Sequence, residues 1–92
     1  MRIDDFHATK NFLKRLAALP ARKQIKVKEA LKLALTDSDN PRLRLHELKG
    51  EHLGTYSISA GGDLRIHFEL VTSNGKTIAS LQAVGTHSQL YR

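Results

Sequence analysis

Residues 63–70 read "DLRIHFEL", and this stretch decides the class of fold. Polar and apolar side chains alternate along it, and a period of two predicts a half-buried β-strand. Its apolar members share one face: Leu64, Ile66, Phe68 and Leu70. Its polar members share the other face: Asp63, Arg65, His67 and Glu69. We therefore expect a strand with one face in the core and the other, including His67, facing solvent.

Signals on both sides of this strand extend it into a sheet. The Asn-Gly pair at 74–75 is a strong hairpin signal, so residues 77–84 are predicted to form the returning strand. Upstream, residues 42–48 and 55–59 also alternate between polar and apolar side chains. Residues 2–6 can add a short edge strand.

Two amphipathic helices are predicted before these strands, over residues 8–19 and 21–35. The first carries apolar residues at helical spacing: Phe12, Leu13, Leu16 and Leu19. The second carries a similar stripe: Val27, Leu31 and either Leu35 or Ala34. Pro20 ends the first helix and suits the first turn of the second. Together they predict an α+β domain over residues 1–92, with an N-terminal helical hairpin packed on a small antiparallel sheet.

The charge of the chain is strongly one-sided. Fifteen Lys and Arg against nine Asp and Glu give a formal net charge of +6. Between residues 10 and 32, Glu29 is the only acid. Eight cations share that segment: Lys10, Lys14, Arg15, Arg22, Lys23, Lys26, Lys28 and Lys32. This pattern favours a polyanionic partner, either nucleic acid or an acidic protein, although a lysine-rich helix surface can also serve solubility alone.

Several classes of protein are disfavoured. The chain has no cysteine, which rules out disulfides and thiolate metal sites. No apolar run approaches the ~20 residues of a membrane span, and the N-terminus lacks the apolar region of a signal peptide. We expect a soluble, cytoplasmic protein.

The five histidines give the candidate chemistry: His7, His46, His52, His67 and His87. Their spacing matches no metal motif, and no nucleotide-binding motif is present, so we expect neither a metal nor a cofactor. Histidine suits general acid–base work at neutral pH, and RNA supplies its own nucleophile in the 2′-OH. On one sheet face, four side chains could supply the proton transfers and the cations: His46, His87, Lys49 and Arg65. His7 and His52 are interpreted as incidental surface residues.

Residues 43–70, "LRLHELKGEHLGTYSISAGGDLRIHFEL", are followed by "AVGTHSQLY" at 83–91. Together they resemble the RelE/ParE superfamily of type II toxin–antitoxin toxins, above all its YafQ-like, RelE/StbE-type branch. The resemblance implies a microbial-ribonuclease-like, RelE-type fold and a metal-independent endoribonuclease that cleaves mRNA, with the ribosome as a partner. It also implies a cognate acidic antitoxin that covers the basic surface.

Carried over residue by residue, the resemblance implies a catalytic set: His46, Asp63, His87 and Tyr91. His46 and His87 would exchange protons, Asp63 would orient a histidine, and Tyr91 would stack on a base. Lys49 and Arg65 would hold RNA phosphates.

Two other functions stay open at this point. A ParE-like toxin of the same fold would act on gyrase, and its histidines would be incidental. A non-catalytic nucleic-acid-binding module would use the basic helices alone, with a steep dependence on salt.

Overall fold

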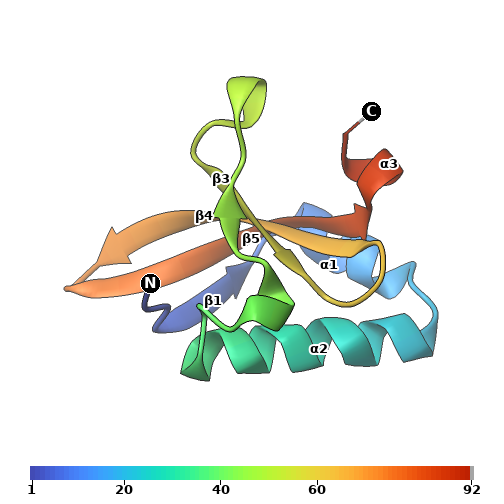
Figure 1. The fold of residues 1–92 in the computed structure, drawn as a ribbon, viewed down its shortest axis with the longest axis horizontal. Coiled ribbons are helices and arrows are strands. Elements are labelled where there is room, and N and C mark those ends of the chain that lie inside the picture. Colours follow the sequence, from blue (N-terminus) through green and yellow to red (C-terminus); the bar gives the residue numbers. More distant parts are fainter. Residues whose placement is uncertain (92) are drawn as a thin grey trace.

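The computed structural model describes residues 1–91 as one five-stranded sheet with helices on both of its sides (Figure 1). The strands lie in the order β1-β5-β4-β3-β2. Their bounds are β1 Asp5–Ala8, β2 His46–Glu47, β3 Thr55–Ser59, β4 Leu64–Ser73 and β5 Lys76–Thr86. The α-helices are α1 Lys10–Ala17, α2 Ala21–Thr36 and α3 His87–Leu90, and two 3₁₀ turns are η1 Pro41–Leu43 and η2 Gly50–His52. The predicted α+β class is confirmed.

The core lies between the sheet and the two N-terminal helices. On the sheet side, the predicted apolar face of β4 is buried through Leu64, Ile66 and Phe68. On the helix side, the buried residues are Phe12 of α1 and three residues of α2: Val27, Ala30 and Ala34. The small alanines face the sheet in place of Leu35, which is exposed. Figure 1 shows α2 along one side of the sheet and α3, with the C-terminus, on the other.

The prediction of a wholly antiparallel sheet is wrong at one edge. β2 to β5 pair antiparallel, but β1 pairs in parallel with β5, with His7 opposite Ser80. Parallel neighbours need a long crossover connection, and the intervening helices and strands supply it. An edge strand was predicted over residues 2–6, and the structure has it at Asp5–Ala8. Nothing in the sequence indicated the direction of its partner. The two helices are consecutive, as predicted, and a close antiparallel packing of one on the other stays a prediction.

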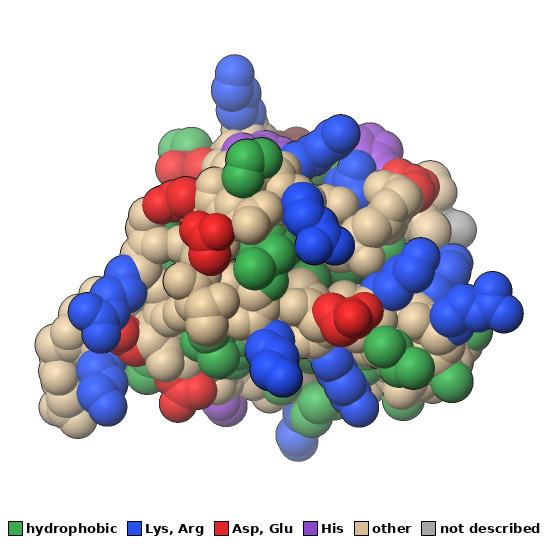
Figure 2. Space-filling model, turned by 60° about the horizontal axis from the view of Figure 1, so that its bottom comes forward, with side chains coloured by type: hydrophobic (Ala, Val, Ile, Leu, Met, Phe, Trp, Pro, Cys, Tyr) green, Lys and Arg blue, Asp and Glu red, His purple; other side chains and the backbone are tan. Residues whose placement is uncertain are grey.

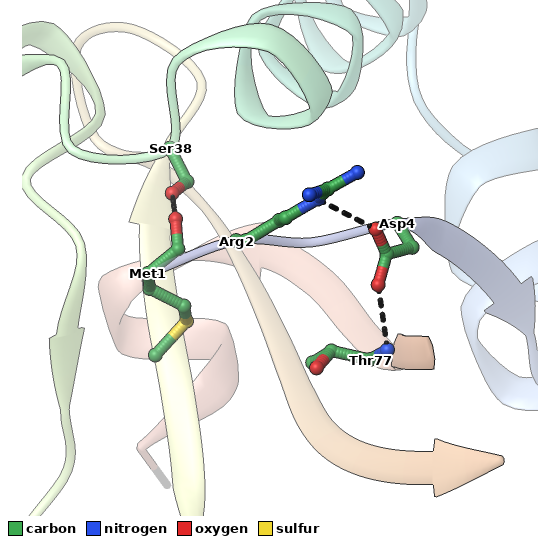
Figure 3. Close-up of polar contacts among 5 residues, drawn as sticks. All are labelled: Met1, Arg2, Asp4, Ser38 and Thr77. Carbon is green, nitrogen blue, oxygen red and sulfur yellow. Dashed lines mark hydrogen bonds and ion pairs between the residues drawn. The ribbon is translucent and has the colours of Figure 1, made fainter. Parts of the chain in front are cut away.

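The N-terminal segment is tied to two distant parts of the chain (Figure 3). The hydroxyl of Ser38, just after α2, donates to the carbonyl of Met1. The Thr77 N–H in β5 donates to Asp4 Oδ2 at 2.8 Å, and this hydrogen bond holds the pKa of Asp4 below its ordinary value. The Arg2 guanidinium adds an ion pair to the same carboxylate at 2.9 Å. These contacts fix the start of β1 at the sheet edge.

The β4–β5 hairpin turns at Asn74-Gly75, as predicted, and both residues have the left-handed φ that this turn requires. Farther along the hairpin, the register shifts by one residue. His67 pairs with Ala83, but Phe68 pairs with Leu81, so Gln82 is the extra residue of a β-bulge. The bulge thus places the small side chain of Ala83 beside His67.

The 42–48 segment is less extended than its alternation predicted, since only His46–Glu47 forms a strand. Asn40 caps the preceding 3₁₀ turn by accepting a hydrogen bond from the Arg42 N–H at 3.0 Å. Arg44 then adopts a left-handed conformation with φ 49°. Turn chemistry around Pro41 therefore replaces the first half of the predicted strand.

No helix within residues 1–91 is both long and apolar enough to cross a membrane.

Candidate functional site

A row of side chains crosses the sheet on the face turned away from α2. Pairing of β2, β3, β4 and β5 places His46 opposite Ser57, Ser57 opposite His67, and His67 opposite Ala83. Ile58, Ile66 and Phe68, which alternate with these residues along β3 and β4, are buried in the core. The row therefore belongs to the second face of the sheet, as the alternation predicted.

The expectation that this face meets solvent is wrong at its centre. His67 is only 5% exposed and Ser57 only 1%. The cover comes from the chain's own C-terminal turn, because the ring of Tyr91 lies against the His67 ring with centroids 5.2 Å apart. Strand alternation alone gives no sign of this cover.

The C-terminal turn has a defined geometry. Thr86 caps α3, and Gln89 completes a capping box by accepting the Thr86 N–H at 2.8 Å. A methyl group at Gly85 would lie 2.7 Å from the Gln89 side-chain oxygen, so glycine leaves room for this cap. The Tyr91 N–H donates to the His87 carbonyl at 3.1 Å, which closes one helical turn. His87 and Tyr91 therefore share one helix face.

Tyr91 is the centre of a group of aromatic rings. Its ring centroid lies 4.4 Å from that of His87, 5.2 Å from that of His67 and 5.7 Å from that of His52. The rings of His52 and His67 approach it edge-on, at 86° and 66°. With His46 in the adjoining row, these residues form what we call the histidine–tyrosine cluster: His46, His52, His67, His87 and Tyr91.

The electrostatics of the cluster centre on His67. Burial, aided by the neighbouring charges of His52, His46 and His87, lowers the pKa of His67 to about 4. Its imidazole is therefore neutral at neutral pH, while the three other histidines stand exposed around it. His46 lies in the same cross-strand row as His67, and His87 contacts Tyr91, which covers His67, so both exposed histidines lie on this side of the sheet.

The backbone orients His46. Its Nδ1 lies 2.7 Å from the Arg44 carbonyl oxygen, and a carbonyl can only accept, so Nδ1 carries the proton. The Nε2 atom is then the one that can accept a proton from a substrate. The left-handed conformation of Arg44 precedes this contact in the chain.

Arg65, Lys49 and Asp63 lie outside the cluster, and they differ in their place in the fold and in their hydrogen bonds. Arg65 is two residues from His67 on the same strand face, and its guanidinium donates to the Gly62 carbonyl at 2.8 Å and to Ser59 Oγ at 3.3 Å. Lys49 is exposed just before η2, the turn that carries His52. Asp63 is exposed in the turn before β4, and no hydrogen bond or ion pair joins it to another of residues 1–91. The structure thus places His87 and Tyr91 in contact, with His46 in the cross-strand row of the same sheet face. A contact of Asp63 with a histidine stays a prediction.

Two members of the cluster were missed from the sequence. His52 was interpreted as incidental, and His67 was expected to face solvent. For His67, the alternation gave no signal of burial, because its cover comes from Tyr91 in the C-terminal turn. For His52, no signal was available, because only the folding of η2 against Tyr91 makes the contact.

Among the described residues 1–91, no three His, Cys, Asp or Glu side chains are grouped so that they could hold a metal ion.

No protein-family model and no curated protein matches this sequence. Solved structures do match it over nearly its whole length. YafQ from E. coli strain BL21(DE3) aligns with a TM-score of 0.77 and 17% identity over 100% of both chains. The YoeB/ParE toxin from Agrobacterium tumefaciens gives 0.72 and 15%, over 90% of this chain and 98% of that one. A chain of the RelBE2 toxin–antitoxin complex from Mycobacterium tuberculosis gives 0.67 and 22%, over 92% and 99%.

The chain therefore has the fold of the RelE-superfamily toxins, with YafQ among the structures that share it. This confirms the fold that the sequence resemblance implied. At these identities the similarity defines the fold, and function has to be inferred from the site.

Proposed function

We propose that this chain is the toxin of a type II toxin–antitoxin system and a metal-independent endoribonuclease that cleaves mRNA on the ribosome. The observation that carries the proposal is the histidine–tyrosine cluster. Two exposed histidines from distant parts of the sequence, His46 and His87, flank one buried imidazole on one sheet face. The shared fold with YafQ supports the same conclusion.

The chemistry needs two proton transfers at one phosphate. One histidine takes the proton from the 2′-OH, whose oxygen attacks phosphorus and forms a 2′,3′-cyclic phosphate. The bond to the 5′ oxygen breaks, and that oxygen leaves with a proton from the second histidine. His46, with Nε2 free to accept, is suited to the first step, and His87 to the second.

Other side chains bind the RNA. Tyr91 offers a ring on which a base can stack, and Arg65 and Lys49 offer cations for the phosphates. Ser59, on the neighbouring strand, accepts a hydrogen bond from the Arg65 guanidinium at 3.3 Å. This contact helps to hold the guanidinium on the sheet face.

A protein antitoxin is the proposed partner of the α2 side. Figure 2, which brings this side forward, shows Lys and Arg side chains standing around apolar ones. A groove of about 750 Å³ runs between α2 and the β3–β4 turn, with Lys26, Lys32 and Arg42 at its rim and Ala30 and Leu33 along it. An acidic amphipathic segment would match both its charge and its apolar floor. The RelBE2 neighbour is itself described as a toxin–antitoxin complex.

The test is induction of the chain in bacteria, followed by primer extension on cellular mRNA. We expect growth arrest and new 5′ ends within translated codons for the wild type, and neither for His87→Ala. His7→Ala is the matched control, since His7 is an exposed histidine on β1, the strand at the far edge from β2. Growth arrest by His87→Ala equal to the wild type would contradict the proposal.

A gyrase-directed toxin is the second candidate, because one structural neighbour is described as a YoeB/ParE toxin. It predicts inhibition of DNA supercoiling by purified gyrase, with no new mRNA ends. A nucleic-acid-binding module predicts salt-sensitive RNA binding that survives removal of both His46 and His87, again without cleavage.

A further inference from the structure

His67 is an unusual residue for its position. It lies at the centre of the sheet, on β4, with β3 on one side and β5 on the other. Its Nε2 atom is buried and has no hydrogen-bond partner among residues 1–91, and the same holds for the Oγ of its neighbour Ser57. An unsatisfied buried polar group costs about 1–3 kcal/mol. An apolar side chain would avoid that cost, so the imidazole calls for an explanation beyond core packing.

The ring of His67 has one prominent contact on its covered side, the ring of Tyr91. Tyr91 in turn lies one helical turn from His87, and their ring centroids are only 4.4 Å apart. The ring of His67, on the central strand β4, therefore supports the ring of Tyr91, and the ring of Tyr91 lies next to exposed His87. By contrast, α3 is a single turn of four residues, too short to hold Tyr91 in place by itself.

We propose that His67 is a positioning residue, a flat platform on the sheet that fixes the ring of Tyr91 and, through it, the orientation of His87. The proposal rests on the proposed ribonuclease function for its catalytic consequence, but its structural part stands alone. What matters is the planar ring of residue 67, which contacts the ring of Tyr91.

The structural part is tested by fluorine NMR. The chain has two tyrosines, so a Tyr56→Phe protein labelled with 3-fluorotyrosine reports Tyr91 alone. With His67 in place, we expect the Tyr91 resonance to lie away from its position in the urea-unfolded protein. In His67→Leu it should move toward that unfolded position. In His67→Phe, which keeps a planar ring, it should stay in place. His7→Leu is the matched control and leaves the resonance unchanged.

Two results would overturn the platform. One is a folded His67→Leu protein whose Tyr91 resonance stays at the wild-type position. The other is a folded His67→Phe protein whose resonance moves as far as that of His67→Leu. If His67→Leu fails to fold, a folded His67→Phe protein whose resonance moves to its position in urea overturns the platform by itself.

The catalytic part is tested by a double-mutant cycle on RNA cleavage. We expect His67→Leu to lower kcat by about tenfold to a hundredfold, as small misplacements of reacting groups do, with KM changing less. In a Tyr91→Ala background the same change should have no further effect, because His67 acts through Tyr91. An equal loss in both backgrounds would show that His67 acts on the RNA or on the fold directly. If the wild type cleaves no RNA, the proposed function fails, while the fluorine experiment still decides the structural part.

Discussion

The two sides of the sheet carry positive charge in different ways. On the α2 side, the cations are exposed lysines and arginines that stand apart from one another; among residues 1–91, none from α2 takes part in an ion pair. On the other side, the histidine–tyrosine cluster places rings from three other segments around the buried imidazole of β4. Scattered cations attract a polyanion over a distance and tolerate imprecise placement. Proton transfer at one phosphate requires fixed geometry, which is why the proposed catalytic site is assigned to the second side.

The largest effect that separates the two sides should come from Tyr91→Ala. We expect RNA cleavage to fall by about a hundredfold, because the variant removes both the stacking surface and the support beside His87. The variant also uncovers His67, so the pKa of that imidazole should rise from about 4 toward the ordinary value of 6.5. NMR titration of the histidine ring protons measures the pKa. An unchanged pKa would show that Tyr91 is not the cover.

Charge reversal on the other side should act on partner binding alone. In Lys26→Glu/Lys32→Glu, both at the rim of the α2 groove, we expect about tenfold weaker binding of the acidic antitoxin at low salt. The loss should shrink as salt rises, because exposed charges are screened. Cleavage by the free toxin should keep its kcat.

The partner for this measurement is the proposed antitoxin, to be sought as a small acidic protein encoded beside this chain. Lys10→Glu/Lys76→Glu is the matched control, since it changes the net charge by the same amount and both lysines are exposed away from the groove. In this control, a loss of binding equal to that of Lys26→Glu/Lys32→Glu would indicate a general effect of net charge, and the groove would then have no special role.

The buried imidazole should make the fold sensitive to acid. The pKa of His67 is about 4 in the folded chain and 6.5 in the unfolded chain, so between these values only the unfolded chain takes up the proton. The free energy of unfolding should therefore fall as the pH drops from 6.5 to 4, by about 3 kcal/mol. Urea unfolding at several pH values checks this, and His67→Leu should lose that part of the pH dependence. His7→Leu should retain it.

The smallest effect is expected at Gly85. A methyl group there would displace the Gln89 amide from the capping box, which is worth about 1 kcal/mol. Gly85→Ala should lower the stability by that amount and lower cleavage by less than Tyr91→Ala does. Thermal unfolding and the cleavage assay check the two parts. Gln89→Ala removes the same side-chain cap without changing Gly85, so it should lower the stability by a similar amount.

Parts of the fold that depend on residues close together in the sequence could be predicted, and parts that depend on distant residues could not. The β4 strand and its hairpin were predictable because alternation and Asn74-Gly75 act within a few residues. The parallel pairing of β1 was not, since it depends on a contact between residues some 70 positions apart, such as His7 and Ser80.

The same distinction between local and long-range contacts holds for the residues of the candidate site. His46, His87 and Tyr91 were found from motifs that lie within short segments. The burial of His67 and the place of His52 depend on the C-terminal turn folding back over the sheet, which no local pattern encodes. Asp63 was expected on the strand face, but β4 begins one residue later, and its carboxylate lies in the turn.

The most direct test of the central claim, that two histidines on one sheet face act as a base and an acid at one phosphate, is the pH dependence of kcat/KM for cleavage of ribosome-bound mRNA. The account predicts a bell-shaped profile for the wild type. His46→Ala should lose one limb of the bell and His87→Ala the other, while His7→Ala keeps both. A profile that keeps both limbs after either histidine of the cluster is removed would contradict the account.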